Sequence, residues 1–491
     1  MKDFTIREHL FSSLKRQDPS KTVLRFPGMS VSAGQLKEDT ECLGTALYAH
    51  GMRGKRIAAY AKSEYGFVLL LTAVCCGKMT LVPLYEKWTR NEKEDILRRT
   101  EAAVFYETFE NISDLVKEGR NRILQGDTLY LEDTVSPEDA SMILFTSGTT
   151  GKAKGVPFLQ RAWQPYVRQI ASIGWNEETL GPQLLLLPLF HLFCSALLIA
   201  FLCNGIPVVF GAGLKHAVEE VQKLKPKALF LVPAQVSLFY YLIREDRARP
   251  EAERKYGNLE RIIYSGAGLS TEMVKGFREF GIMINSAYSM TECSGIAFDP
   301  YALTQIKPGS SGRLLPEAKD LVRIGDPDPE GYGELLISED YTGVFKGYLD
   351  DPEETEKILY DGWLHTGDLA RIDQDGDLFI TGRIKNLIIL SNGENVSPEK
   401  LEQLVMRLEG VRECMVYEED NRLTVKIVPG DMGEGFFEGD TEKYFREKVY
   451  QMNRELPPYE QISRIRICDR LEKNAAGKKI RINHGISADH L

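Results

Sequence analysis

The 491-residue sequence has little cysteine, little histidine and no excess of positive charge. Its eight cysteines form no Cys-x-x-Cys pair and have no histidines nearby, which argues against a disulfide framework or a zinc site and favours reduced, mostly buried thiols. With 61 basic and 71 acidic residues the formal charge is −10, so a generally basic nucleic-acid-binding surface is not expected. Hydrophobic and charged contents of 43% and 27% exclude a disordered or fibrous chain.

Long apolar runs are also missing, with one exception. The first twenty residues contain none, so no secretory signal is visible and we expect a cytoplasmic protein. Leu184–Cys203 carries no formal charge over a length of about 20 residues, which would span a bilayer. Because Pro188 and His191 interrupt it and arginine-rich flanks are missing, we expect instead a buried strand (184–190), a core helix (192–203) and no stable membrane span.

The length allows about three domain-sized units. Between residues 184 and 292, short apolar runs alternate with helix-like stretches, which predicts a parallel sheet covered by helices on both faces. Ligand sites in such sheets lie beyond the carboxyl ends of the strands. The segments SGAG (265–268) and SAYSMTE (286–292) fall at those ends and are therefore candidates for a binding site.

After about residue 300 the pattern changes. Asp375-Gly376 lies between two alternating apolar segments and predicts a hairpin. Beyond residue 385 the order becomes strand, helix, strand, strand, an α+β pattern of about 105 residues that suits a separate small domain. Ser397 is expected to cap the helix of this region, and Gly410 to end it.

The segment TSGTTGKAKGV (146–156) carries the most chemical information. It combines three Gly, three Thr, one Ser and two Lys after the apolar run SMILF. Glycines let backbone amides converge on a polyanion, hydroxyls add donors and lysines neutralise charge. The segment does not satisfy the Walker A pattern. It predicts a phosphate-binding loop rather than a turn that is merely flexible.

This loop resembles the phosphate loop of the acyl-adenylate-forming superfamily, which includes acyl-CoA synthetases, peptide-synthetase adenylation domains and luciferases. Four further motifs follow in the family's order, and acyl-CoA synthetases are the most similar in motif. They are AYSMTE (287–292), GWLHTGDLA (362–370), TGRIKNLIILSNGENVSP (381–398) and NAAGKKIR (474–481). The resemblance extends over essentially the whole chain, with weaker similarity at GYLDDPEET (347–355).

The resemblance implies an α/β fold. We expect a large N-terminal domain (residues 1–384) with doubly wound parallel sheets and a β-rich subdomain, which binds ATP and the acid. A small mobile α+β domain (385–491) would form a lid. The implied enzyme is an acid–thiol ligase: ATP activates a carboxylic acid to an acyl-adenylate with release of pyrophosphate, and the acyl group passes to a pantetheine thiol. Mg²⁺ is expected as cofactor, and CoA as acceptor.

The resemblance also assigns roles to residues of this sequence. Glu292, with Thr149, would bind Mg²⁺ through hard oxygen atoms, and Thr291 belongs to the same motif. Asp368 would accept hydrogen bonds from the ribose hydroxyls, and Arg383 would contact the ribose or the phosphates. Residues expected to hold the β and γ phosphates are Thr146, Ser147, Gly148, Thr149, Thr150 and Lys154. Those expected to form the adenine site are Gly266, Ala267 and Tyr288.

Two lysines take special roles in this scheme. Lys478 would lie over the α-phosphate and the attacking carboxylate and neutralise both. It falls in a segment (464–481) with seven basic and two acidic residues, a local excess in an acidic protein. Lys385 falls at the family's hinge, where the small domain turns between adenylation and thioester formation.

The acid is expected to be fatty or aromatic rather than an amino acid. Amino-acid-adenylating relatives place an Asp where this sequence has His191, and a His there is similar to acyl- and aryl-CoA ligases, in which it gates or lines the acyl pocket. Phe190, Phe193 and Cys194 suit an apolar substrate. The sequence departs from the family motifs at four positions that could alter the acyl pocket or acceptor recognition. They are Ser289, Glu472, Asn474 and Ala476.

Three functions stay open at this point. The first is an acyl-CoA synthetase-like ligase, and the second an adenylating enzyme that loads an acyl, aryl or amino acid onto a carrier protein. The third is a nucleotide-binding homologue that has lost catalysis. The chain keeps charged residues that an inactive homologue would have no need to retain: Lys154, Glu292, Asp368, Arg383 and Lys478.

Overall fold

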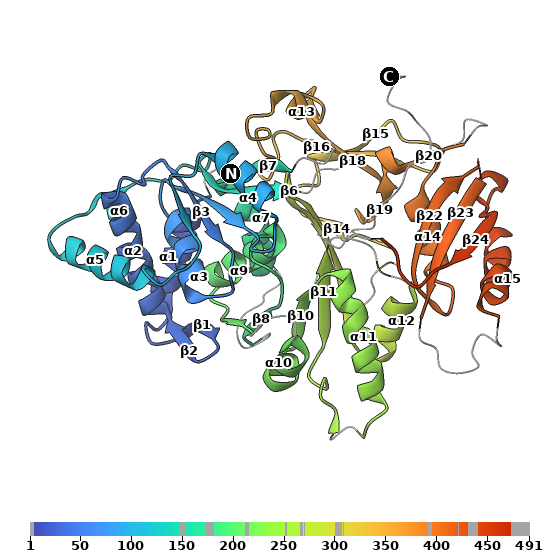
Figure 1. Cartoon of the computed structure of the whole chain (residues 1–491), viewed down its shortest axis with the longest axis horizontal. Helices are drawn as coiled ribbons and strands as arrows, with labels where there is room; N and C mark the ends of the chain where they lie inside the picture. The colour runs from blue at the N-terminus through green and yellow to red at the C-terminus, as the bar shows by residue number, and fades with distance from the viewer. Residues whose placement is uncertain are drawn as a thin grey trace.

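The computed structural model shows several sheets and helical layers arranged along the chain (Figure 1). The structure describes residues 4–146, 153–172, 181–211, 216–250, 253–265, 269, 271–299, 307, 309–390, 395–420, 422–430 and 440–472. For residues 271, 272, 389 and 395 it describes only the backbone.

The N-terminal part is built on a five-stranded sheet, in the order β5-β3-β4-β6-β7. Its strands are β3 (Arg56–Tyr60), β4 (Thr80–Leu84), β5 (Val104–Tyr106), β6 (Ala140–Thr146) and β7 (Lys154–Leu159). The first four run parallel, and β7 pairs antiparallel with β6. Because β7 runs antiparallel to β6, the chain returns to the end of β6 within the predicted phosphate loop (146–156).

Helices pack around this sheet, at the left of Figure 1. They are α1 (Ile6–Arg16), α2 (Ala33–Ala49), α3 (Tyr65–Cys75), α4 (Arg90–Thr100), α5 (Ile112–Leu124) and α6 (Leu129–Glu132). Helices α2 and α5 approach closely because Gly119 has no side chain: a Cβ there would lie 1.8 Å from the Cys42 carbonyl oxygen.

The parallel sheet expected over residues 184–292 is divided between two sheets. Strands β8 (Gln183–Leu185) and β9 (Val208–Phe210) join β1 (Thr22–Phe26) and β2 (Met29–Ser32), in the order β2-β1-β9-β8. A second sheet has the order β10-β11-β12-β13-β14. Its strands are β10 (Ala228–Leu231), β11 (Arg261–Ser265), β12 (Met283–Met290), β13 (Ser294–Phe298) and β14 (Arg313–Leu314).

The expectation of a single sheet was therefore wrong, although β/α alternation was correct. Strands β10, β11 and β12 are parallel, whereas β13 pairs antiparallel with β12, and β14 pairs antiparallel with β13. The intervening helices are α7 (Gln164–Ser172), α9 (Leu192–Cys203), α10 (Ala217–Leu224), α11 (Pro233–Arg247) and α12 (Thr271–Glu279). The predicted strand over 184–190 is shorter than expected and ends at Leu185.

The apolar segment 184–203 contributes to the protein core, as predicted. All but one of the twelve residues of α9 are buried. Among the described helices, none combines the length and the hydropathy needed to cross a bilayer. All eight cysteines are free thiols; seven are buried and Cys468 is partly exposed, which confirms the prediction of mostly buried thiols.

A β-rich region follows, at the top of Figure 1. Its strands are β15 (Val322–Gly325), β16 (Gly333–Ser338), β17 (Leu359–Tyr360), β18 (Trp363–Ile372) and β19 (Leu378–Arg383). The short helix α13 (Pro352–Glu356) precedes β17. Strands β18 and β19 form the hairpin predicted at Asp375-Gly376, where Gly376 has a φ of +80°.

The C-terminal elements form a smaller α+β unit, at the right of Figure 1. It contains β20 (Ile388–Ile389), β21 (Asn395–Val396), α14 (Pro398–Val405), β22 (Val411–Glu419), β23 (Arg422–Pro429), α15 (Thr441–Asn453) and β24 (Arg464–Ile467). Ser397 caps α14 as predicted, by accepting from the Lys400 amide. Gly410 does not end this helix; α14 stops at Val405, and Gly410 lies in the turn before β22.

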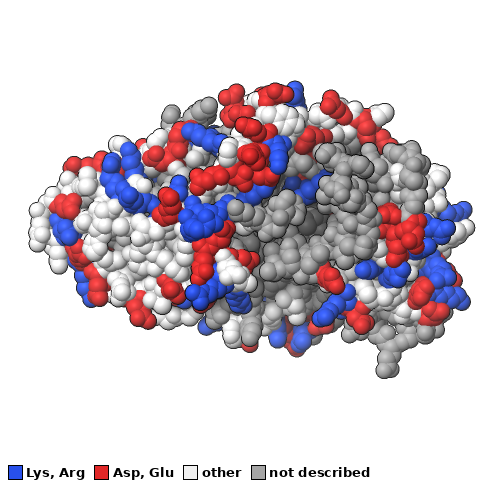
Figure 2. Space-filling model, turned by 45° about the horizontal axis from the view of Figure 1, so that its top comes forward, with Lys and Arg blue, Asp and Glu red and all other residues white. Residues whose placement is uncertain are grey.

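Both signs of charge are interspersed over the face shown in Figure 2. The absence of a generally basic surface stays a prediction.

Candidate functional site

The ends of strands β6 and β7 form the base of the predicted phosphate loop. Thr146 and Lys154 are paired across this antiparallel ladder, so the loop leaves and returns at adjacent positions. Ser147, Gly148, Thr149 and Thr150 lie outside the described residues. Both ends of the loop therefore meet at one place, and Lys154 is fixed there by a strand.

Lys154 lies among oppositely charged and aromatic groups. Its ammonium forms an ion pair with Glu354 of α13 and lies 4.8 Å from the centre of the Tyr348 ring. Only 19% of the Lys154 side chain is exposed. The hydrogen bond from Lys154, and that from Lys357, lower the pKa of the Glu354 carboxyl to about 2. Neither Glu354 nor Tyr348 was a predicted site residue, although both lie in the segment 347–355 that weakly resembles the family.

Glu292 occupies the tight turn between β12 and β13, next to Thr291. It is buried, and its Oε1 accepts a hydrogen bond of 2.9 Å from the Tyr348 hydroxyl. The Glu292 carbonyl accepts a second bond of 2.9 Å from the Phe345 amide. Burial and the nearby Glu292 carboxylate raise the pKa of Tyr348, which keeps its hydroxyl protonated as the donor. Tyr348 thus joins Glu292 to Lys154.

Asp368 and Arg383 face each other on paired strands β18 and β19. Arg383 Nε lies 2.6 Å from Asp368 Oδ1, and the Tyr288 hydroxyl donates to Asp368 Oδ2 at 2.5 Å. Arg383 also donates to the Thr366 carbonyl at 2.8 Å. Burial raises the pKa of Asp368, and the Arg383 charge opposes that rise. The structure therefore brings together three residues predicted separately for ribose, phosphate and adenine.

This cluster, Tyr288–Asp368–Arg383, can still accept a diol. Each carboxylate oxygen of Asp368 has a second lone pair beyond the one that Tyr288 or Arg383 occupies. Gly266 and Ala267 lie outside the described residues, but β11 is described to Ser265, which pairs with Ala287 next to Tyr288. The predicted adenine segment therefore continues from a strand adjacent to Tyr288.

The predicted hinge residue follows this cluster directly. Lys385 lies, exposed, in the 3₁₀ helix η4 (Ile384–Asn386), which begins where β19 ends at Arg383. Its positive charge lowers the pKa of Asp368, though less than Arg383 does and against the larger effect of burial. Short 3₁₀ turns are frequent connectors between elements. Lys478 lies outside the described residues.

The predicted acyl-pocket residues do not lie together. His191 is exposed at the start of α9 beside the Phe190 ring, with 4.0 Å between ring centres, and Phe190 stacks on Tyr85 at 4.4 Å. Cys194 is buried and donates to the Leu187 carbonyl. Among these residues, Phe193 lines a small, partly enclosed cavity between α7, α9 and strands β10–β13. His191, Phe190 and Cys194 are not among its lining residues.

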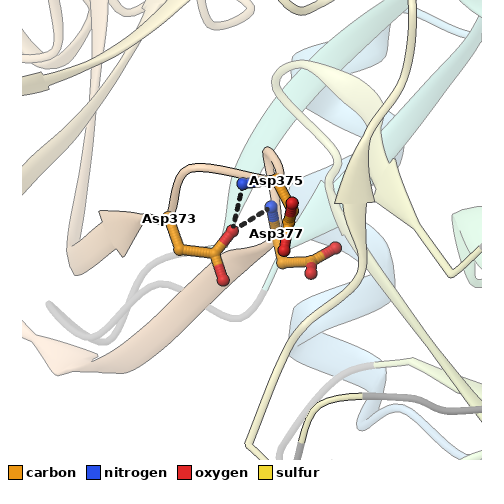
Figure 3. Close-up of side chains that lie close together, drawn as sticks. All are labelled: Asp373, Asp375 and Asp377. Carbon is orange, nitrogen blue, oxygen red and sulfur yellow. Dashed lines mark hydrogen bonds between the residues drawn. The ribbon is translucent and has the colours of Figure 1, made fainter.

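Three carboxylates gather in the β18–β19 turn: Asp373, Asp375 and Asp377 (Figure 3). The Lys307 ammonium lies 2.5, 2.6 and 3.0 Å from Asp373, Asp375 and Asp377. Asp373 Oδ1 accepts the amides of Asp375 and Asp377 at 3.0 Å each. Because Lys307 pairs with all three carboxylates and Arg313 pairs with Asp377, the arrangement is that of an ion-paired turn.

Glu292 is the described carboxylate that best fits a magnesium–nucleotide complex. It is a buried hard-oxygen ligand at the turn between two strands, and Tyr348 holds one of its oxygens in place. Lys154 supplies a cation at the base of the loop on the other side of Tyr348. The donor set therefore suits a polyphosphate with a hard divalent cation.

Two family models match this chain. The model of the AMP-binding enzyme matches residues 11–349, and that of the AMP-binding enzyme C-terminal domain matches residues 400–478. A 2-succinylbenzoate–CoA ligase of Listeria monocytogenes is 27% identical, over 94% of this chain and 96% of its own length.

Two further similarities cover most of the chain. A 3-[(3aS,4S,7aS)-7a-methyl-1,5-dioxo-octahydro-1H-inden-4-yl]propanoyl:CoA ligase of Rhodococcus jostii is 28% identical over 90% of this chain and 91% of its own length. The O-succinylbenzoate coenzyme A synthetase of Bacillus subtilis in complex with AMP has a TM-score of 0.77 at 22% identity, and 96% of each chain is covered. At that identity the structural match shows the fold alone.

Proposed function

Because this chain belongs to the AMP-binding enzyme family, we propose that it activates a carboxylic acid with ATP and transfers the acyl group to the thiol of CoA. Family membership confirms the motif resemblance described above. The observation that carries the proposal is the meeting of Tyr288, Asp368 and Arg383 near the strand turn that holds Glu292. Tyr288 and Glu292 are four residues apart, so one hairpin positions both clusters.

In the first half-reaction, a carboxylate oxygen of the substrate attacks the α-phosphorus of ATP. The bond between the α-phosphorus and the oxygen bridging to the β-phosphate breaks, and pyrophosphate leaves with that electron pair. The substrate supplies the nucleophile, so the protein has to align the reactants and stabilise the charge that develops on phosphate. In the second half-reaction the thiol attacks the acyl carbon, loses its proton, and AMP leaves.

The described residues suit these tasks. Lys154 would neutralise the β and γ phosphates together with the residues of its loop, exchanging its partner Glu354 for phosphate oxygens. Asp368 would accept the ribose hydroxyls, held in orientation by Arg383 and Tyr288. Glu292 would bind Mg²⁺, with Thr149 as a second ligand; when bound, the ion would neutralise phosphate charge.

We further propose that residues 385–491 form the mobile lid, that it turns at Lys385 and that it carries Lys478 to the α-phosphate. The C-terminal hydrophobic core supports this division, because it is built from residues after 387 alone. The much larger core of the preceding part ends at Leu378. Two separate cores allow one part to rotate while its own packing stays intact.

The test is a product analysis with ATP, Mg²⁺, CoA and a set of fatty, aromatic and amino acids. We expect AMP and pyrophosphate to form in equal amounts with an acid present, together with the corresponding acyl-CoA. A parallel arm replaces CoA by a carrier protein bearing phosphopantetheine. Thioester on the carrier protein but not on CoA would favour the carrier-loading alternative. ATP binding without any acid-dependent pyrophosphate release would favour the inactive nucleotide-binding homologue.

A further inference from the structure

Strand β18 contains a bulge where it runs beside β16 (Figure 1). Successive positions of β18 that pair with β16 are His365 and Leu369. The residues between them, 366–368, therefore lie opposite a single residue of β16, Leu335. Asp368 is the last residue of this bulge. Bulges interrupt the ladder of backbone hydrogen bonds, and beside binding sites they often redirect a side chain.

Side chains replace the hydrogen bonds that the interrupted ladder would have made. The Thr366 hydroxyl donates to the Leu335 carbonyl at 2.8 Å and accepts from the Asp368 amide at 3.1 Å. The Gly367 amide donates to Glu334 Oε1 at 2.9 Å. The conformation of the bulge therefore depends on two side chains, those of Thr366 and Glu334.

Glu334 is itself held in place on its other side. His365 Nδ1 lies 2.8 Å from Glu334 Oε2, and the ring of Tyr360 stacks on the His365 ring with 3.8 Å between ring centres. The Glu334 and His365 side chains are only 24% and 17% exposed. A carboxylate that is engaged through both oxygens has little freedom to turn, so Glu334 holds the Gly367 amide at a fixed distance from β16.

The Gly367 amide lies one residue before Asp368, so its orientation affects that of the Asp368 carboxylate. A rotation of this part of the bulge would turn the Asp368 side chain away from Tyr288 and Arg383, which bond its two oxygens. Hydrogen bonds weaken steeply when they are misaligned. The carboxylate would then be poorly placed to accept from two vicinal hydroxyls at once.

On the basis of the ribose role given to Asp368 in the proposed function, we propose that Glu334 is a positioning residue of the nucleotide site. By holding the Gly367 amide, it directs Asp368 towards the ribose diol and gives the chain its preference for ATP over deoxynucleotides. Glu334 acts through its reach to Gly367 and His365, not through its charge.

The experiment measures equilibrium binding of ATP and of 2′,3′-dideoxy-ATP, each with Mg²⁺, by titration calorimetry. The two ligands differ only in the hydroxyls that Asp368 is expected to bind. For the wild type we expect the dideoxy analogue to bind about tenfold more weakly, as for hydrogen bonds lost from a charged acceptor. In Glu334→Ala the Kd for ATP should rise and that for the analogue should stay constant, so that the two differ by less than about threefold.

Two conservative variants separate reach from charge. Glu334→Gln has the same length, and its amide oxygen can still accept from Gly367 while its nitrogen faces His365; it should keep the preference of the wild type. Glu334→Asp keeps the charge but is one methylene shorter, so it cannot reach both partners and should lose the preference. The reverse order would overturn the positioning role. This pair of variants decides the matter even if Glu334→Ala fails to fold.

Glu118→Ala is the matched control. Glu118 is also a carboxylate beside a histidine, 3.0 Å from His50 Nε2, and it accepts from Arg122 at 2.8 Å, but it lies on α5. This variant should leave the preference for ATP unchanged. A folded Glu334→Ala that discriminates as well as the wild type does would overturn the inference.

The wild-type measurements distinguish failure of this inference from failure of the proposed function. Equal binding of ATP and the dideoxy analogue would overturn the ribose role of Asp368, and the inference with it, while acid-dependent pyrophosphate exchange would still support the proposed activity. A wild type that discriminates between the two ligands but shows no such exchange with any acid would overturn the proposed activity. The role of Glu334 would then be decided by its variants alone.

Discussion

At the scale of single residues, Asp368 has the most constrained position in the described site. It is 3% exposed, and both oxygens are held by Arg383 and Tyr288. A buried carboxylate is retained at a cost in desolvation, which the Arg383 charge and the Tyr288 hydroxyl offset. In an adenylating enzyme this arrangement gives a fixed acceptor for the ribose hydroxyls.

Asp368→Asn is expected to raise the KM for ATP at least tenfold, because an amide oxygen is a weaker acceptor than a carboxylate. It should also lower the free energy of unfolding by about 2 kcal/mol, since Arg383 loses its counter-charge. Initial rates at varied ATP and urea denaturation measure the two effects.

The control for this change is Asp246→Asn in α11. Asp246 is equally buried and accepts the amides of Lys255 and Tyr256 at 2.9 and 3.0 Å. Asp246→Asn should lower the free energy of unfolding without any change in the KM for ATP. If Asp368→Asn likewise leaves this KM unaltered, the ribose role is wrong.

The Lys154–Glu354 pair makes stability depend on pH. The pKa of Glu354 is lowered to about 2 in the folded chain, below its ordinary value in the unfolded chain. The ionised Glu354 carboxylate therefore contributes fully to the free energy of unfolding above its ordinary pKa, near pH 4.5. That contribution is lost as the pH falls towards 2. The stability difference between wild type and Glu354→Gln should shrink over that interval.

Denaturant titrations between pH 6 and 3 follow this difference. Glu353→Gln removes the neighbouring exposed carboxylate and serves as control; it should change stability little at any of these pH values. A difference for Glu354→Gln that stays constant down to pH 3 would contradict the pairing with Lys154.

At the scale of elements, two connections position the site: the β12–β13 turn and the step from β19 into η4. The first fixes Glu292 in the turn after β12, and Ser294, two residues later, begins β13 with a φ of +66°. The second carries the chain from Arg383 in the site to Lys385 in three residues. A rotation at this step would move the C-terminal elements relative to Asp368.

Lys385→Pro should leave adenylation largely intact and slow thioester formation at least tenfold. Proline fixes φ and removes an amide hydrogen, which restricts the rotation that the second half-reaction is expected to need. Pyrophosphate exchange measures the first step and acyl-CoA formation the second.

Lys385→Ala is the matched variant, because it removes the charge but keeps the backbone free to rotate. It should retain acyl-CoA formation better than Lys385→Pro. Equal loss of both half-reactions in Lys385→Pro would count against a hinge at this position.

At the scale of the whole molecule, local patterns predicted the kinds of element but not their partners. The alternation over residues 184–292 correctly predicted strands and helices, yet β9 pairs with β1, which lies more than 180 residues earlier. The apolar pattern of a sequence shows that a strand is buried. It does not show which sheet the strand joins, because the strand would be buried in either one. The division into two sheets therefore leaves no local signal.

The same limit applies to the site. Asp368, Arg383 and Tyr288 follow from motifs, and the structure brings them together. Tyr348 and Glu354 were missed because their partners lie 56 and 200 residues away, and the weak resemblance over residues 347–355 assigns no role to either.

We expect this chain to form an acyl-adenylate and to need Lys478, in the C-terminal part, to form it. The most direct measurement is exchange of labelled pyrophosphate into ATP without CoA, for the wild type and for Lys478→Ala. We predict exchange that depends on an added carboxylic acid in the wild type, and its loss by at least a hundredfold in Lys478→Ala with ATP binding retained. Exchange that is independent of acid, or undiminished in Lys478→Ala, would contradict the account.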